Sequence, residues 1–152
     1  MAQLKPGDAA PVFRLPDQDG NTVALDQLQG KKVLVYFYPK ADTPGCTKQA
    51  CSIRDSSGDL TGKNIVALGI SPDQPGAQKK FDEKFGLSFP LLSDPDHATA
   101  EAYGAWGEKN RQGKVSMGII RSSFLIDEEG RIEKAWYSVA PLDTVPQALA
   151  AV

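Results

Sequence analysis

One segment restricts the fold of this chain more than any other. The apolar run at residues 33–38 leads through a turn rich in Pro and Gly into a segment whose first cysteine is Cys46. A continuous apolar run of this length is typical of a strand buried on both faces. The Pro/Gly turn indicates that a helix follows, with Cys46 at its start. The segment therefore predicts an α/β fold that presents a cysteine at the N-terminus of a helix.

The predicted position of Cys46 is suited to a nucleophile. The first turn of a helix leaves backbone N–H groups unpaired and carries partial positive charge, which favours a thiolate over a thiol. The thiolate is the form of cysteine that attacks other molecules. Cys51 lies five residues further along the same predicted helix, where this field has largely decayed. We therefore expect Cys46 to be the more reactive of the two cysteines.

The spacing of Cys46 and Cys51 carries a second argument. Five residues of α-helix correspond to about 7.5 Å of rise and about 140° of rotation. Disulfides rarely join residues whose Cα atoms are more than about 7 Å apart. A bond between the two cysteines would therefore require local unwinding of the helix. This favours a redox cycle over the alternative, a structural disulfide in a secreted protein.

Composition excludes several classes of function. The chain has 17 Lys and Arg against 19 Asp and Glu, so no broad basic surface for nucleic acid is expected. No stretch approaches the roughly 20 apolar residues that cross a membrane, and the start lacks the apolar core of a signal peptide. The only histidine, His97, is distant from the cysteines, and there is no Gly-rich phosphate loop. We expect a cytoplasmic protein without a metal or other cofactor.

Strands and helices alternate along the chain. A hairpin (13–15 and 22–24) precedes the strand at 33–38, and a helix follows at 46–60. The order then continues with a strand (65–70), a helix (75–85), a short strand (91–92) and a short helix (97–103). A second hairpin (122–126 and 131–137) and a helix from residue 143 complete it. This order predicts one domain, residues 1–152, with a thioredoxin-like α/β fold and an N-terminal β-hairpin extension.

The pattern Pro39-x-x-x-Thr43-x-x-Cys46 resembles the active-site signature of the peroxiredoxins. The longer string over residues 36–51, together with Arg54-Asp55, resembles their bacterioferritin comigratory protein or peroxiredoxin Q subgroup. Segments 103–109, 113–114 and 118–127 are similar to the same subgroup, so the resemblance spans nearly the whole chain. It implies a thiol peroxidase that reduces hydrogen peroxide and organic hydroperoxides without metal, haem or flavin.

The resemblance also implies a role for each cysteine. Cys46 would attack the peroxide and become a sulfenic acid. Cys51 would resolve it as an intramolecular disulfide, the atypical two-cysteine arrangement, and thioredoxin or a glutaredoxin-like dithiol would reduce this disulfide. Residues 75–86, where some members of the subgroup carry the resolving cysteine, contain none. If Cys51 is only a small buried hydrophobic residue, an external thiol would resolve the sulfenic acid instead.

Three further catalytic residues are implied by the same resemblance. Thr43 would hydrogen-bond the peroxide and the thiolate, and Pro39 would shield the thiolate from water. Arg121 would stabilise both the thiolate and the leaving oxygen. Without the resemblance, these residues indicate only a helix cap, the end of a strand and a solvated strand terminus.

Backbone N–H groups near Gly45 and Cys46 would complete the substrate-binding site. Gln49, nearly one turn beyond Cys46, would support its hydrogen bonds. We therefore expect the peroxide to contact the residues Thr43, Gly45, Cys46, Gln49 and Arg121.

Two other functions remain open at this stage. A general thiol–disulfide oxidoreductase is disfavoured, because the cysteines lack the Cys-x-x-Cys spacing of that class. A redox sensor or holdase could use the same helix opening as a switch. A monomer is expected, since no cysteine extension at the C-terminus is present to bridge subunits.

Overall fold

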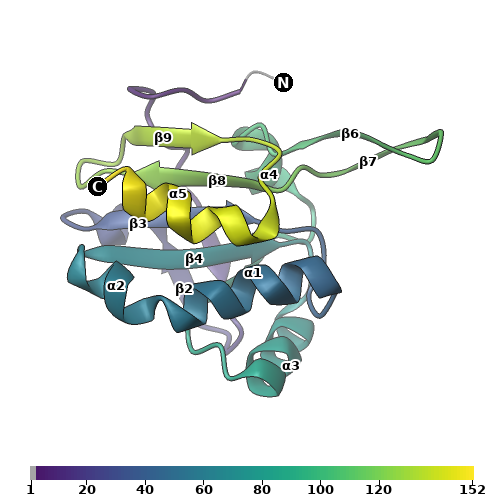
Figure 1. The fold of residues 1–152 in the computed structure, drawn as a ribbon, viewed down its shortest axis with the longest axis horizontal. Helices are drawn as coiled ribbons and strands as arrows, with labels where there is room; N and C mark the ends of the chain where they lie inside the picture. Colours follow the sequence, from purple (N-terminus) through teal and green to yellow (C-terminus); the bar gives the residue numbers. More distant parts are fainter. Residues whose placement is uncertain (1–2) are drawn as a thin grey trace.

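The computed structural model describes residues 3–152. Its centre is a five-stranded sheet of order β5-β4-β3-β8-β9 (Figure 1). β3 (Lys32–Phe37), β4 (Ile65–Ser71) and β5 (Leu91–Ser93) are parallel to one another. β8 (Ser122–Ile126) runs antiparallel to β3, and β9 (Ile132–Trp136) runs antiparallel to β8. The mixed sheet confirms the predicted α/β fold class.

One face of the sheet carries Val33, Val35 and Phe37 of β3 in its core. It is covered by the N-terminal hairpin, a short 3-10 helix and α4. The core residues Phe13 and Tyr103 belong to this side. The covering elements are β1 (Arg14–Pro16), β2 (Thr22–Ala24), η1 (Leu25–Leu28) and α4 (Ala98–Ala102).

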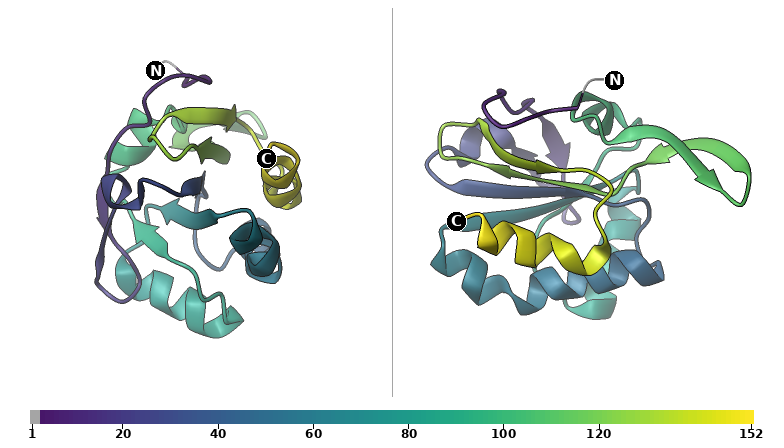
Figure 2. Two further views of the ribbon diagram at one scale, coloured as in Figure 1. Left: turned by 90° about the vertical axis from the view of Figure 1, so that its left-hand side faces the viewer. Right: turned by 45° about the horizontal axis from the view of Figure 1, so that its top comes forward.

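The opposite face carries Leu34 and Tyr36 of β3, and the remaining helices pack against it. Figure 2 shows the C-terminal helix lying beside the cysteine-bearing helix on this face. Because alternate residues of β3 are buried on both sides, the strand is apolar along its whole length, as the sequence indicated. The helices here are α1 (Pro44–Asp55), α2 (Ser57–Gly62), α3 (Pro75–Phe85) and α5 (Thr144–Ala150), which the short η2 (Pro141–Asp143) precedes.

The helix predicted over residues 46–60 is wrong in both its start and its continuity. α1 begins at Pro44, because proline is well accommodated at the first helical position. Cys46 is therefore the third helical residue rather than the first. The helix ends at Asp55, and Ser56 separates it from α2. The sequence Ser56-Ser57-Gly58 is rich in weak helix formers, which explains the interruption.

A hairpin that the apolar patterns did not predict extends from the body of the fold (Figure 1). It consists of β6 (Trp106–Arg111) and β7 (Lys114–Ile119), joined through Gln112 and Gly113. Both turn residues have positive φ, 54° and 84°, as a two-residue hairpin turn requires. Residues 114–117 are exposed, so the hairpin lacks the alternation of a half-buried strand.

The other predicted elements lie close to their expected positions, including both flanking hairpins and the helix at 75–85. The assignment of residues 1–152 to one domain stays a prediction. None of the helices in residues 3–152 has the length and apolar character needed to span a bilayer.

Candidate active site

The structure places Cys46 in the first turn of α1, with 2% of its surface exposed. The first intrahelical bond runs from the N–H of Thr47 to the carbonyl of Thr43, at 2.8 Å. The N–H groups of Gly45 and Cys46 precede this bond, so helix geometry gives them no partner within α1. They add to the positive end of the helix beside the sulfur.

Arg121 lies directly against Cys46. Its Nη2 donates to the Sγ of Cys46 at 3.4 Å. The topology explains this contact, because Ser122 at the start of β8 pairs with Phe37 at the end of β3. Arg121 is thereby held at the end of the sheet where β3 leads into the loop before α1. This contact places a guanidinium directly beside the sulfur of Cys46.

Gly45 and Gln49 complete the surroundings of the Arg121 side chain. A Cβ at Gly45 would lie 3.2 Å from the Nη2 of Arg121 and 3.5 Å from the Cγ of Pro141. Gln49 is fully buried, and its Oε1 accepts a hydrogen bond of 2.5 Å from the Nη1 of Arg121. The guanidinium is therefore confined on one side by backbone and fixed on the other by an amide.

Thr43 occupies the N-cap position of α1, but its side chain makes no capping hydrogen bond. Its hydroxyl instead donates to the carbonyl of Lys40 at 2.8 Å. A hydroxyl has a single proton, so in this arrangement Thr43 cannot also donate to the thiolate of Cys46. The expected hydrogen bond from Thr43 to the thiolate is therefore absent from the structure. The lone pairs of the Thr43 hydroxyl oxygen remain available as acceptors.

Pro39 borders an open cleft beside Arg121. The cleft has a volume of about 380 Å³ and reaches from the end of β3 to the β6–β7 hairpin. Pro39 follows the last residues of β3, as expected for a strand terminator. The cleft gives a small molecule a route to the guanidinium; its lining residues are Pro39, Glu108, Lys109, Asn110, Ile120, Arg121 and Ser138.

Cys51 lies in the same uninterrupted helix as Cys46, and both are free thiols. Its side chain is half-buried and packs against the core beneath α1. One turn further on, Arg54 donates from Nη1 to the carbonyl of Phe85 at 2.5 Å, which joins the end of α1 to the end of α3. Cys51 thus packs against the core with Arg54 close enough to interact with it electrostatically, whereas the sulfur of Cys46 accepts a hydrogen bond directly from the guanidinium of Arg121.

A buried hydrogen-bond network that the sequence analysis missed holds the loop before α1. The N–H of Ala41 donates to the Oδ2 of Asp73 at 2.7 Å, and the Ser71 hydroxyl donates to the same oxygen at 2.7 Å. Gln78 donates to Ser71 at 2.8 Å and accepts from the hydroxyl of Tyr38 at 2.5 Å. Burial raises the pKa of Tyr38, which keeps this donor protonated. The sequence signal for this network was Ser-Pro-Asp at the end of the buried strand β4.

Tyr36 forms part of the floor beneath α1, in the same core cluster as Cys46. Burial raises the pKa of Tyr36 well above its ordinary value, and the neighbouring Tyr38 and Cys46 raise it further. The hydroxyl is fully enclosed and has no hydrogen-bond partner within residues 3–152. The floor of the site is therefore uncharged, which leaves Arg121 as the charge in contact with the sulfur.

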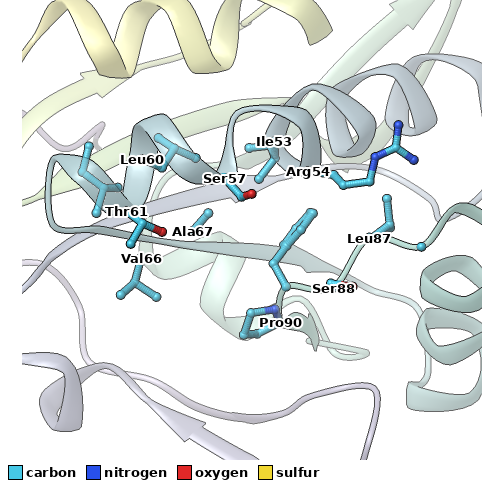
Figure 3. A pocket seen from close by; sticks show the side chains of 13 residues that line it. Ile53, Arg54, Ser57, Leu60, Thr61, Val66, Ala67, Leu87, Ser88 and Pro90 are labelled. Atoms are coloured by element: carbon cyan, nitrogen blue, oxygen red, sulfur yellow. The ribbon is translucent and has the colours of Figure 1, made fainter.

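A second cavity, of about 360 Å³, lies at the C-terminal end of α1 (Figure 3). It is lined mainly by apolar side chains of α1, α2 and β4 and by residues 86–90, and neither cysteine lines it. It is therefore separate from the chemistry at Cys46. In residues 3–152, no group of three or more His, Cys, Asp or Glu side chains is placed to hold a metal ion.

Comparison with known proteins agrees with the class that this fold and cysteine site define, a peroxiredoxin. The chain matches the AhpC/TSA family over residues 6–135 and belongs to that family. It is 56% identical over 133 residues to the peroxiredoxin Bcp of Escherichia coli, which covers 88% of this chain and 85% of that protein.

Solved structures show the same likeness. The peroxidoxin BcpB of Mycobacterium tuberculosis superposes with a TM-score of 0.87 at 34% identity, over 98% of this chain and 96% of that one. The bacterioferritin comigratory protein of Xanthomonas campestris, described for its alkyl peroxide reduction activity, gives 0.87 at 32% identity, over 99% and 95%. These relatives are of the bacterioferritin comigratory protein and peroxiredoxin Q subgroup. The chain is thus a thiol-dependent peroxidase, which takes a peroxide as substrate and a thiol as reductant.

Proposed function

We propose that this protein reduces hydrogen peroxide and organic hydroperoxides through a cycle in which Cys46 attacks and Cys51 resolves. The observation that carries the proposal is the contact of 3.4 Å between the Nη2 of Arg121 and the Sγ of Cys46 in the first turn of α1. A thiolate is the nucleophilic form of cysteine, and a guanidinium at hydrogen-bond distance stabilises it.

In the first step, the Cys46 thiolate attacks the OH oxygen of the hydroperoxide. An S–O bond forms and the O–O bond breaks, so the sulfur is oxidised to sulfenic acid and the other oxygen leaves as an alkoxide or hydroxide. That oxygen then takes up a proton to give alcohol or water. Arg121 is placed to stabilise the negative charge as it moves from sulfur to oxygen. The Thr43 hydroxyl, which donates its hydrogen bond to the backbone carbonyl of Lys40, would accept a hydrogen bond from the O–H of the peroxide.

In the second step, the thiolate of Cys51 attacks the sulfur of the Cys46 sulfenic acid. An S–S bond forms, and hydroxide leaves and is protonated to water. Both cysteines lie in one continuous helix, so this step follows unwinding of the turns that separate them. A dithiol reductant then exchanges with the disulfide and restores both thiols, while its own two thiols become a disulfide.

Thioredoxin or a glutaredoxin-like protein would be the dithiol reductant. A cytoplasmic location stays a prediction, and it suits a cycle that depends on reduced dithiols. The monomeric state also stays a prediction. The use of Pro39 to shield the sulfur is supported by its position at the border of the cleft beside Arg121.

Turnover of hydrogen peroxide with thioredoxin, thioredoxin reductase and NADPH tests the proposal. Cys46→Ser should abolish turnover, because it removes the nucleophile. Cys51→Ser should keep the first oxidation, detected as a sulfenic acid trapped by dimedone, while turnover with thioredoxin falls. Unchanged turnover in Cys51→Ser would show that an external thiol resolves. Turnover that survives in Cys46→Ser would refute the assignment of the nucleophile, and no turnover in the wild type would favour a sensor or holdase.

A further inference from the structure

Thr144, the first residue of α5, is far from Cys46 in the sequence but is joined to the active site by a hydrogen bond. Its side chain is fully buried, and its Oγ1 accepts a hydrogen bond of 2.8 Å from the Nε2 of Gln49. The segment before α5 also lies against the site, since Pro141 is close to Gly45. The C-terminal helix therefore reaches the surroundings of Cys46 although it carries no nucleophile or charge there.

The direction of each hydrogen bond explains what Thr144 does. A guanidinium can only donate, so Gln49 must turn its Oε1 toward Arg121. The NH₂ group of the same amide then points the other way and needs an acceptor, because it is fully buried. The Oγ1 of Thr144 is that acceptor. The relay thus runs from Thr144 through Gln49 to Arg121, whose Nη2 contacts the sulfur.

We propose that Thr144 is a positioning residue for the peroxidase reaction, which fixes the amide of Gln49 and through it the guanidinium of Arg121 at Cys46. The inference rests on the proposed roles of Cys46 and Cys51. It adds a residue that touches neither the sulfur nor the peroxide. Loss of the hydroxyl leaves the buried amide without its acceptor, which favours rotation of the amide and release of Arg121.

The hydrogen bond between Thr144 and Gln49 opposes the second step of the cycle, formation of the disulfide. Gln49 lies between Cys46 and Cys51, within the turns that must unwind before the disulfide forms. Its hydrogen bonds to Arg121 and Thr144 exist only while those turns are helical. Thr144 therefore speeds the attack of Cys46 on peroxide and slows the formation of the disulfide.

Thr144→Val tests this prediction, because it replaces the hydroxyl with a methyl group of similar volume. In a Cys51→Ser background, the rate of Cys46 oxidation by hydrogen peroxide should fall about tenfold. With Cys51 present, conversion of the sulfenic acid to the disulfide, followed by acid quenching and mass spectrometry, should become faster. Thr144→Ser keeps the hydroxyl and should restore both rates. If Thr144→Val does not fold, Thr144→Ala is measured in the same way.

Val145→Ala is the matched control, since Val145 is the next buried residue of α5 and makes apolar contacts instead. It should not shift the two rates in opposite directions. A further check uses Gln49→Met, in which Thr144→Val should have no additional effect on the oxidation rate. The proposal is overturned if Thr144→Val leaves Cys46 oxidation unchanged, if both rates fall together, or if Val145→Ala gives the same opposite shifts. Failure of wild-type Cys46 to react with peroxide would instead refute the proposed function.

Discussion

The two halves of α1 differ in what holds them to the rest of the protein. The half that contains Cys46 is held by directional hydrogen bonds to distant segments: Gln49 bonds to Arg121 and to Thr144. The half that contains Cys51 is held mainly by apolar packing, and by Arg54 bonding to the last carbonyl of α3. In the half that contains Cys46 the guanidinium of Arg121 contacts the sulfur, whereas in the other half the guanidinium of Arg54 bonds to a backbone carbonyl.

In the proposed cycle, this difference separates the two steps within one helix. The first half would present the sulfur of Cys46 to a peroxide, and its hydrogen bonds depend on helical geometry. The disulfide requires those turns to unwind, whereas the contact of Arg54 with Phe85 lies beyond Cys51 and need not break. We therefore expect unwinding to be confined to the half that contains Cys46.

Substitution of Arg121 is expected to change the rate of Cys46 oxidation more than any other substitution considered. Arg121→Met should lower the rate of Cys46 oxidation by about 100-fold, because it removes the charge that stabilises both thiolate and leaving oxygen. Arg121→Lys should recover only part of the rate, since a single ammonium cannot contact Cys46 and Gln49 with the geometry of a guanidinium. The measurement is stopped-flow oxidation by hydrogen peroxide.

Arg54→Lys is the matched control for Arg121, because Arg54 lies at the other end of α1 and contacts Phe85. It should leave the rate of Cys46 oxidation unchanged. Equal losses of oxidation rate in Arg121→Lys and Arg54→Lys would mean that helix stability, and not the guanidinium beside Cys46, controls the reaction.

A smaller effect is expected from Gly45→Ala. The added Cβ would lie 3.2 Å from the Nη2 of Arg121, so the guanidinium must shift by a few tenths of an ångström. We expect the oxidation rate to fall by up to about tenfold, while the free energy of unfolding changes by less than about 1 kcal/mol. Urea unfolding and stopped-flow oxidation of the same samples separate the two quantities. A large loss of stability would show that the glycine serves packing rather than the reaction.

The smallest effect is expected at the surface ion pair between Lys84 of α3 and Asp42 of the loop before α1. The two groups are 2.9 Å apart, but their side chains are 59% and 45% exposed. Lys84→Gln should therefore change the free energy of unfolding by no more than about 0.5 kcal/mol and leave peroxide oxidation unchanged. A clear loss of oxidation rate would indicate that this pair, and not the buried network of Asp73 and Gln78, holds the loop.

Much of the fold was predictable because its signals are local and strongly apolar. The buried strand at β3 and the turn into α1 follow from residues 33–51, and the antiparallel hairpin of β8 and β9 follows from its glycine-containing turn. The exposed β6–β7 hairpin was missed because pairing between its own strands, rather than burial, maintains it. The break at Ser56 was missed because the apolar pattern continues through Leu60.

Fewer features of the site than of the fold could be predicted from the sequence. Cys46 follows from its position at a helix start. Arg121 was implied only by the family resemblance, because it lies 75 positions away and is brought to the sulfur by the pairing of β8 with β3. Thr144 and Asp73 act through hydrogen bonds between segments that no local pattern connects. The direction of the Thr43 hydrogen bond is set by the nearby carbonyl of Lys40, which only the folded loop reveals.

In the proposed cycle, Cys46 reacts within the folded helix and is then joined to Cys51 after the helix opens. The decisive experiment is mass spectrometry of the protein treated with one equivalent of hydrogen peroxide. The intact chain should lose two hydrogens and yield a peptide that links residues 46 and 51. A product in which Cys51 stays a free thiol while Cys46 carries oxygen or an external thiol would contradict the proposed cycle.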